Sequence, residues 1–305
     1  MLLTDCDLAV RQNRGWKLNK QHDSKKPQSD GHHAHSAGGH SHNHIPTKGK
    51  AFGIGIGLNV IFVIAEVIYG VSSNSVALVA DAAHNAGDVL GLILAWVAMI
   101  LARRTPTSHR TYGLRRSTIL ATLANAILLL IAVGGVIWEA VVRIKNPGSV
   151  DGSTVIIVAA IGVFINGVSA FFFFKDKDSD ANVRGAFLHL AADAAVSVGV
   201  VIGGFIILKT GWHVIDPVIS IIISLVILVS TWSLFKDALN LSLDSVPKNI
   251  DILKVKSSIL EARNIRSVHD LHVWSMSTTE VALTAHLVTT DKEIPTDVLS
   301  DLRET

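Results

Sequence analysis

The chain has 305 residues, of which 49% are hydrophobic and only 17% are charged, and its mean hydropathy is +0.44. These values are unusual for a soluble protein and indicate a protein with several membrane-spanning segments. The formal net charge of +2, with no basic block interleaved with aromatic residues, argues against nucleic-acid binding. A single cysteine excludes an intramolecular disulfide and a cysteine-based zinc site.

Residues 1–50 are polar and show no sustained apolar period. We expect a flexible tail on the cytosolic side of the membrane, because the segment lacks the apolar core of a signal peptide. Two interpretations of its histidines are open: a solvated or tag-like segment, and a weak collector of Zn2+, Ni2+ or Cu2+, for which neutral imidazole is a common ligand. These histidines are His22, His32, His33, His35, His40, His42 and His44.

Six apolar stretches follow, each near the ~20 residues that a helix needs to cross the hydrocarbon core. They predict an all-α membrane domain of six transmembrane helices, over residues 51–240, with both termini on the same side. The connection between the second and third stretches is rich in arginine, whereas the turn before it carries no charge. By the positive-inside rule this connection and both termini are cytoplasmic. The stretches are 52–72, 78–102, 117–142, 153–174, 184–208 and 214–235.

Residues 241–305 have a mixed composition, typical of a small soluble domain. The pattern predicts a helix over 249–262, strands over 267–275 and 280–289, and another helix from Thr296. This α-β-β-α unit is small for independent stability, so we expect it to pair with a second copy of itself. The fold class is therefore a helical membrane domain with a small α+β cytoplasmic domain.

The spacing His-x-x-x-Asp occurs twice inside the apolar stretches, as His84 with Asp88 and as His189 with Asp193. A carboxylate at the centre of a membrane helix costs about 3 kcal/mol and needs compensation. Residues four apart lie on one helix face, so two such faces supply two nitrogens and two oxygens, a tetrahedral shell suited to Zn2+, with Co2+ or Cd2+ as alternatives. Protons in place of the metal would preserve the empty site, which predicts exchange of protons for metal.

The alternative for each of these residues is a role in packing or hydrogen bonding between helices. The occurrence of two matched pairs argues against this alternative. Asp81 has two interpretations, a hydrogen-bonding or capping residue and a group near the ion. Glu66 and Glu139, like Asn59 and Asn166, are expected to form hydrogen bonds between helices. The pair Asp216-Pro217 is typical of a helix start.

The motifs Ala80-Asp-Ala-Ala-His-Asn-Ala-Gly-Asp88, Leu188-His-Leu-Ala-Ala-Asp193, Asp216-Pro217 and Val268-His-Asp-Leu-His-Val-Trp274 resemble those of the cation diffusion facilitator family, and within it the bacterial zinc exporters. The resemblance covers about residues 50–290. It implies a homodimer in the bacterial inner membrane that exports Zn2+ in exchange for protons by alternating access. The implied ligands are His84, Asp88, His189 and Asp193, and the first histidine implies a preference for zinc, with Cd2+, Co2+ or Ni2+ also possible.

The resemblance also implies that the cytoplasmic domain has a metallochaperone-like, ferredoxin-like fold through which the protein dimerises. His269 and His286 match positions that bind regulatory metal in some relatives, and His272 lies near them. A solvated strand face is the alternative interpretation of His286. The family domain continues with a further strand and additional ligands beyond the point where this sequence stops, so we expect the domain here to be either unusually short or incomplete.

Three other function classes compete with a proton-coupled exporter. A membrane metalloenzyme needs an open coordination position and a general base, and four closing ligands leave neither, so we do not expect an enzyme. A non-transporting sensor or buffer would rely on the histidine-rich tail and the soluble domain. A passive channel would conduct zinc without a proton gradient.

Overall fold

A computed structural model describes residues 5–12, 50–174, 181–262 and 264–290. The chain divides into two compact units, one formed by Gly39–Ala238 and the other by Met1–Gly38 together with Leu239–Thr305. The first unit is helical, and the second is built on a β-sheet.

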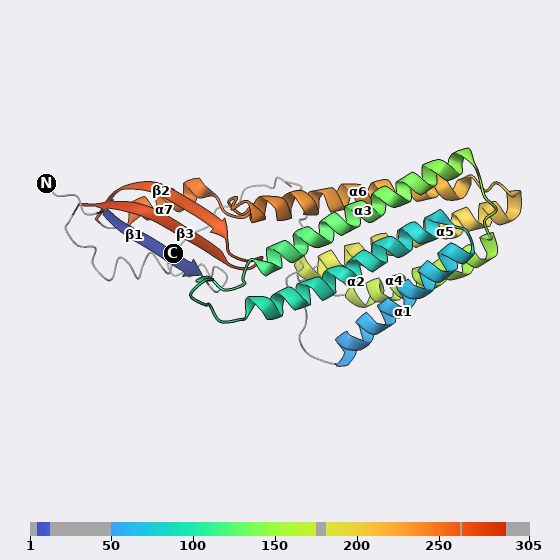
Figure 1. The fold of residues 1–305 in the computed structure, drawn as a ribbon, viewed down its shortest axis with the longest axis horizontal. Coiled ribbons are helices and arrows are strands. Elements are labelled where there is room, and N and C mark those ends of the chain that lie inside the picture. Colours follow the sequence, from blue (N-terminus) through green and yellow to red (C-terminus); the bar gives the residue numbers. More distant parts are fainter. Residues whose placement is uncertain (1–4, 13–49, 175–180, 263, 291–305) are drawn as a thin grey trace, which may run out of the picture. The chain divides into compact units, whose positions relative to one another are not determined.

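Long helices make up the first unit, and Figure 1 shows them roughly aligned along one axis, with consecutive helices running in opposite directions. They are α1 Lys50–Ser72, α2 Val76–Ala102, α3 Ser117–Lys145, α4 Gly152–Phe174, α5 Ala181–Thr210 and α6 Ile215–Ser242. Five of them, α2 to α6, are long and apolar enough to cross a membrane. The described apolar part of α1 is shorter, Asn59–Ser72, so the sixth span remains a prediction.

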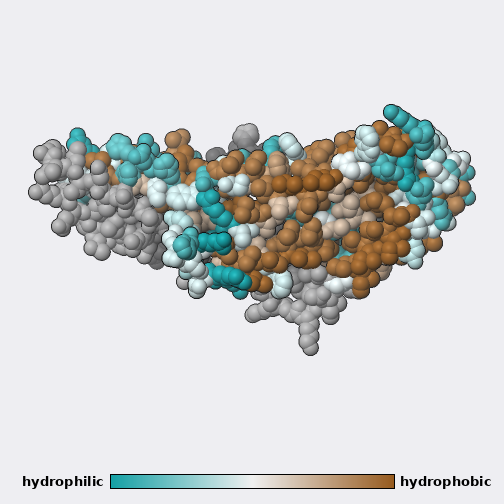
Figure 2. Space-filling view, viewed as in Figure 1, coloured by the Kyte–Doolittle hydropathy of each residue, from teal (hydrophilic) through white to brown (hydrophobic). Residues whose placement is uncertain are grey.

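The surface of the helical unit is apolar, as Figure 2 shows for the visible face. Large side chains such as Phe164, Phe172 and Val229 are at least 70% exposed. A water-soluble monomer rarely exposes a continuous apolar surface of this kind, whereas lipid chains are a favourable surrounding for it. The protein is therefore an integral membrane protein.

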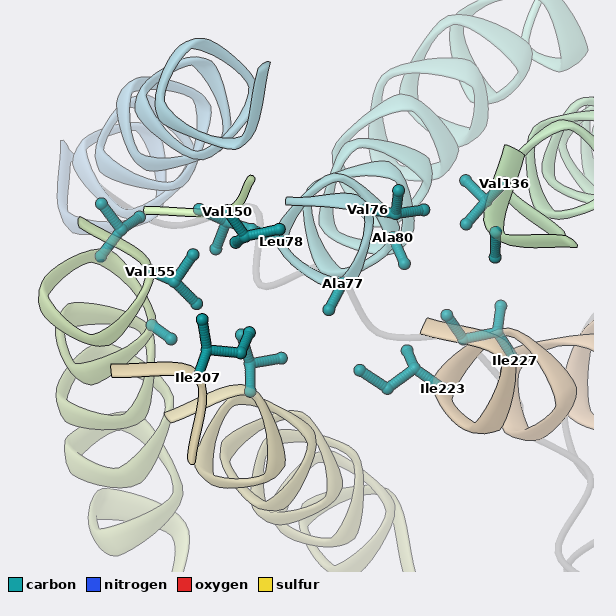
Figure 3. Packing of buried hydrophobic residues seen from close by; sticks show 14 of the residues in the cluster. Val76, Ala77, Leu78, Ala80, Val136, Val150, Val155, Ile207, Ile223 and Ile227 are labelled. Atoms are coloured by element: carbon teal, nitrogen blue, oxygen red, sulfur yellow. The ribbon is translucent and has the colours of Figure 1, made fainter. Parts of the chain in front are cut away.

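The core of the helical unit gathers around the first two turns of α2. Figure 3 shows Val76, Ala77, Leu78 and Ala80 between buried side chains of the neighbouring helices, among them Val155 and Ile223. Helices α4 and α5 approach closely where Gly152 faces Gly204. A Cβ atom at Gly152 would lie 2.7 Å from the carbonyl oxygen of Gly204, so a larger residue there would push the helices apart.

The connections α1–α2, α3–α4 and α5–α6 meet at one end of the helical unit, which we call the turn end. The backbone N–H of Asp151 donates to the carbonyl of Ser73 at 3.0 Å, and that of Val150 donates to His213 Nδ1 at 3.1 Å. Arg143 Nη1 donates to the carbonyl of Asn74 at 2.6 Å. The opposite end, where α2 ends and α3 begins, includes the connection 103–116 and is called the loop end; α2 runs from the turn end to the loop end and α5 runs back.

Asp216 starts α6, as predicted, and also holds the start of α2. Its carboxylate accepts hydrogen bonds from Ser75 Oγ at 2.5 Å and from the backbone N–H of Val76 at 2.6 Å. The first N–H groups of a helix have no partner within the helix, so a buried carboxylate that accepts from them stabilises the helix start. Asp216 is 2% exposed, which leaves water little access to replace it.

The second unit contains α7 Ile252–Glu261, β2 Ile265–Ser275 and β3 Val281–Thr289, and these confirm the predicted helix and the two predicted strands. The strands pair antiparallel, and Ile259 of α7 packs with Val268, Ala285 and Leu287 in a small core. The helix predicted from Thr296 lies outside the described residues.

A third strand, β1 Asp5–Gln12, pairs antiparallel with β3, and the sheet order is β1-β3-β2. The prediction of a flexible tail was wrong for residues 5–12, which form this strand. An unpaired strand edge offers a row of free N–H and C=O groups, which a distant segment can satisfy through its backbone alone. Such pairing leaves little trace in the hydropathy pattern.

Replacing Asp216 by alanine should destabilise the protein. The change leaves Ser75 Oγ and two backbone N–H groups buried without their acceptor, which should cost about 3 kcal/mol. Thermal unfolding of the purified protein in detergent measures the loss. The control, Asp151→Ala, removes an exposed carboxylate and should cost about 1 kcal/mol; equal losses in the two variants would contradict the role of Asp216.

Candidate metal centre

His84, Asp88, His189 and Asp193 come together from α2 and α5. One ligand atom from each lies within 4.8 Å of all the others. In the described part of the chain, no other group of three or more His, Cys, Asp or Glu side chains is close enough to hold one ion. The structure thus brings the four residues predicted from the repeated spacing into one cluster.

The contacts in this cluster cross between the two helices. His84 Nε2 lies 3.2 Å from Asp193 Oδ1, and His189 Nε2 lies 3.2 Å from Asp88 Oδ2. Within each helix the distances are longer, 3.9 Å on α2 and 3.6 Å on α5. Because α2 and α5 run in opposite directions and carry the same spacing, the histidine of one helix faces the aspartate of the other.

These distances suit a small tetrahedral ion. Ligand atoms about 2.1 Å from a central Zn2+ lie about 3.4 Å from one another in a regular tetrahedron. The four contacts between histidine and aspartate span 3.2–3.9 Å. The imidazole rings are nearly perpendicular, at 80° with 6.0 Å between their centroids, so their nitrogens approach the centre from different directions.

Exposure of the four side chains rises from the turn end to the loop end. His84 and Asp193, nearer the turn end, are 16% and 7% exposed, whereas Asp88 and His189 are 32% and 37% exposed. The two proposed ligands nearer the loop end are therefore the more exposed pair.

Asp81 lies outside this cluster, one turn before His84. It is 1% exposed, and its Oδ2 accepts a hydrogen bond from Ser197 Oγ on α5 at 3.0 Å. Of its two predicted roles, the structure shows the hydrogen bond between helices. Glu66 also bonds between helices as predicted, because Asn85 Nδ2 of α2 donates to its Oε2 at 2.8 Å.

Glu139 was predicted to form a hydrogen bond between two helices, but its bond lies within one helix. Its Oε1 accepts from Arg143 Nε at 2.8 Å within α3, four residues along the helix. Glu139 is half exposed at this position, and an arginine one turn away reaches it more easily than a residue of a neighbouring helix. The network of Glu66, Asn85, Asp81 and Ser197 was not predicted as a unit, since nothing in one sequence shows which polar residues of separate helices meet.

His269 and His286 lie directly opposite each other on β2 and β3. His286 Nδ1 is 3.1 Å from Asp270 Oδ2, and His269 Nε2 is 3.1 Å from Ser267 Oγ. His272 is exposed on β2 beyond an irregularity of the strand and pairs with Thr284. Metal binding by these three histidines remains a prediction.

Two family models match the chain: the cation efflux transmembrane domain over residues 54–241 and the cytoplasmic domain of cation efflux proteins over residues 247–302. The chain belongs to the cation efflux family. This is a family of transporters, and its second model is that of a dimerisation domain.

Curated relatives extend the match over most of the chain. It is 37% identical to the metal cation efflux system protein CzcD of Cupriavidus metallidurans, over 87% of this chain and 84% of the relative. It is 36% identical to the zinc transporter ZitB of Escherichia coli, over 84% and 82%. It is 32% identical to a cadmium, cobalt and zinc/H(+)-K(+) antiporter of Bacillus subtilis, over 83% and 82%.

Replacing His189 by alanine should remove one strong zinc equivalent per protomer from a calorimetric titration. The change deletes one of two nitrogen donors, and its effect should exceed the 10–100-fold loss that follows from altering residues around a metal shell, so we expect a loss of more than about 100-fold. The control, His109→Ala, removes an exposed histidine of the 103–116 connection. Unchanged strong binding in the His189 variant would contradict the assigned cluster.

Proposed function

We propose that this cation efflux protein exports Zn2+ from the cytosol in exchange for protons. The observation that carries the proposal is the cluster of two imidazole nitrogens and two carboxylate oxygens in the middle of α2 and α5. Relatives named as zinc transporters, and one named as a zinc/H(+)-K(+) antiporter, support the substrate and the coupling.

Charge explains why such a cluster suits a divalent ion inside a membrane. Asp88 and Asp193 together carry two negative charges, which a bound Zn2+ cancels, whereas the neutral imidazoles add none. Two nitrogen donors favour Zn2+ over Mg2+ and Ca2+, which prefer oxygen ligands. Cd2+, Co2+ and Ni2+ accept the same donor atoms, so they are the expected secondary substrates.

Protons compete with the metal for all four ligands, because zinc binds only the neutral imidazole and the ionised carboxylate. Low pH on one side of the membrane therefore empties the site there, and neutral pH on the other side allows it to fill. In alternating access the site faces one side at a time. The greater exposure of Asp88 and His189 supports a conformation that is open at the loop end, which the positive-inside rule assigns to the cytosol.

The proposal also includes the topology, the location and the dimerisation of the protein. α1 forms a sixth span, both termini are cytoplasmic, and the membrane is the bacterial inner membrane. Residues 1–50 form a cytoplasmic tail, residues 51–240 the transport domain and residues 241–305 a ferredoxin-like domain that joins two copies of the chain. The match to a family dimerisation domain supports this homodimer. His269 and His286 are the proposed regulatory ligands, with His272 beside them.

Transport itself should depend on Asp193. In everted vesicles an imposed pH gradient, acidic inside, should drive zinc uptake, and Asp193→Asn should abolish it because a neutral amide neither cancels the ion's charge nor binds a proton. The control, Asp244→Asn, changes an exposed aspartate after α6 and should transport normally. Uptake by folded Asp193→Asn at the rate of the wild type would refute the proposed site.

Metal choice should shift when His84 is replaced by aspartate. The change substitutes an oxygen for a nitrogen donor and adds a negative charge, which favours harder ions. We expect uptake of Mn2+ relative to Zn2+ to rise several-fold in competition assays with both ions. His109→Asp adds the same charge away from the site and should leave the ratio unchanged; an unchanged ratio in His84→Asp would argue against ligation by residue 84.

A further inference from the structure

Glu66 and Asp81 form a second pair of buried carboxyl groups beside the proposed metal site. Their exposed fractions are 0% and 1%. Each has one hydrogen-bonded oxygen: Glu66 Oε2 accepts from Asn85, and Asp81 Oδ2 accepts from Ser197. The other oxygens, Glu66 Oε1 and Asp81 Oδ1, are buried and have no hydrogen-bond partner among the described residues.

The surroundings of Glu66 offer no cation to balance a negative charge. The charged groups that act on it electrostatically are Asp81 and His84 on α2 and Asp193 on α5. α4, which also packs against α1, contains no titratable residue. Of these groups only His84 could carry a positive charge, and its Nε2 is already paired with Asp193. A proton on Oε1 would remove the uncompensated charge of Glu66.

The side chain of Glu66 lies at about the same depth in the helical unit as the proposed metal site. It lies six residues before Ser72, the last residue of α1, which is about 9 Å along the helix. On α2, His84 and Asp88 lie about 12 and 18 Å from the helix start at Val76. Asn85, which donates to Glu66 Oε2, directly follows His84 on α2, so the carboxyl group of Glu66 lies beside the proposed ligands without being one of them.

We propose that Glu66 is a proton-binding residue of the exchange cycle, separate from the metal ligands. Its Oε1 takes up one proton from water that enters at the turn end and returns it to water at the loop end, once for each ion exported. Asn85 holds Oε2 throughout and so keeps Oε1 available. This role rests on the proposed exchange of zinc for protons.

The variant Glu66→Gln tests the role, because glutamine has the shape of glutamate and can accept the same bond from Asn85 but cannot bind or release a proton. In proteoliposomes, radioactive zinc should continue to exchange with unlabelled zinc at equal pH on both sides. The acceleration of zinc uptake by a one-unit pH gradient should fall in the variant to less than half of the wild-type factor. Glu139→Gln, on α3, is the matched control and should keep the full acceleration.

Infrared difference spectra of the purified protein between acid and neutral pH provide a second readout. A band of a protonated carboxyl group should disappear in Glu66→Gln and shift in Glu66→Asp, which retains a titratable group. If Glu66→Gln fails to fold, the shift of the band in Glu66→Asp decides between a proton-binding and a purely structural role. A purely structural role for Glu66 would leave both the band and the acceleration unchanged in folded Glu66→Gln, and this result would overturn the proposal.

Failure of the proposed antiport gives a different result. A wild-type protein whose zinc uptake does not respond to the pH gradient would refute proton exchange itself. A wild-type protein that responds, together with a Glu66→Gln variant that responds equally, would refute only the role of Glu66.

Discussion

The crossed contacts of His84 with Asp193 and of His189 with Asp88 are the interaction on which the membrane domain depends. Two carboxyl groups inside apolar helices are costly unless a partner compensates them. Here the partners come from the opposite helix, so neither α2 nor α5 can move far along the other without separating a histidine from its aspartate. Packing and polar chemistry therefore fix the same register between the two helices.

At the turn end of the domain, several contacts hold the ends of the helices together. Asp216 binds the start of α2, the connections beside it bond to one another, and the first turns of α2 fill the apolar core. The loop end lacks a comparable buried cluster in the described residues, and the ligand side chains nearest to it are the most exposed. A transport cycle must open the first end and close the second, so the contacts at the turn end are those that have to break.

The features that were predictable from the sequence are those that repeat within a short segment. The helices follow from apolar stretches of sufficient length, and the cluster of the four proposed ligands follows from two copies of one spacing, because antiparallel helices with the same spacing bring unlike residues together. The bond from Asp216 to Ser75, the contact of Glu66 with Asn85 and the pairing of β1 with β3 each join residues far apart in the chain. A single sequence carries no periodic signal for such contacts, so they required the structure.

Counting charges in the interior links the metal cluster to the second pair of carboxyl groups. Four carboxyl groups, those of Glu66, Asp81, Asp88 and Asp193, lie close to two imidazoles. One Zn2+ in the proposed site would balance Asp88 and Asp193 and would leave Glu66 and Asp81 with the neutral donors Asn85 and Ser197. A negative charge on Glu66 therefore adds to the charge that attracts the metal, and a proton on Glu66 weakens that attraction. Proton and metal occupancy are coupled through this shared charge even where the two do not share a ligand.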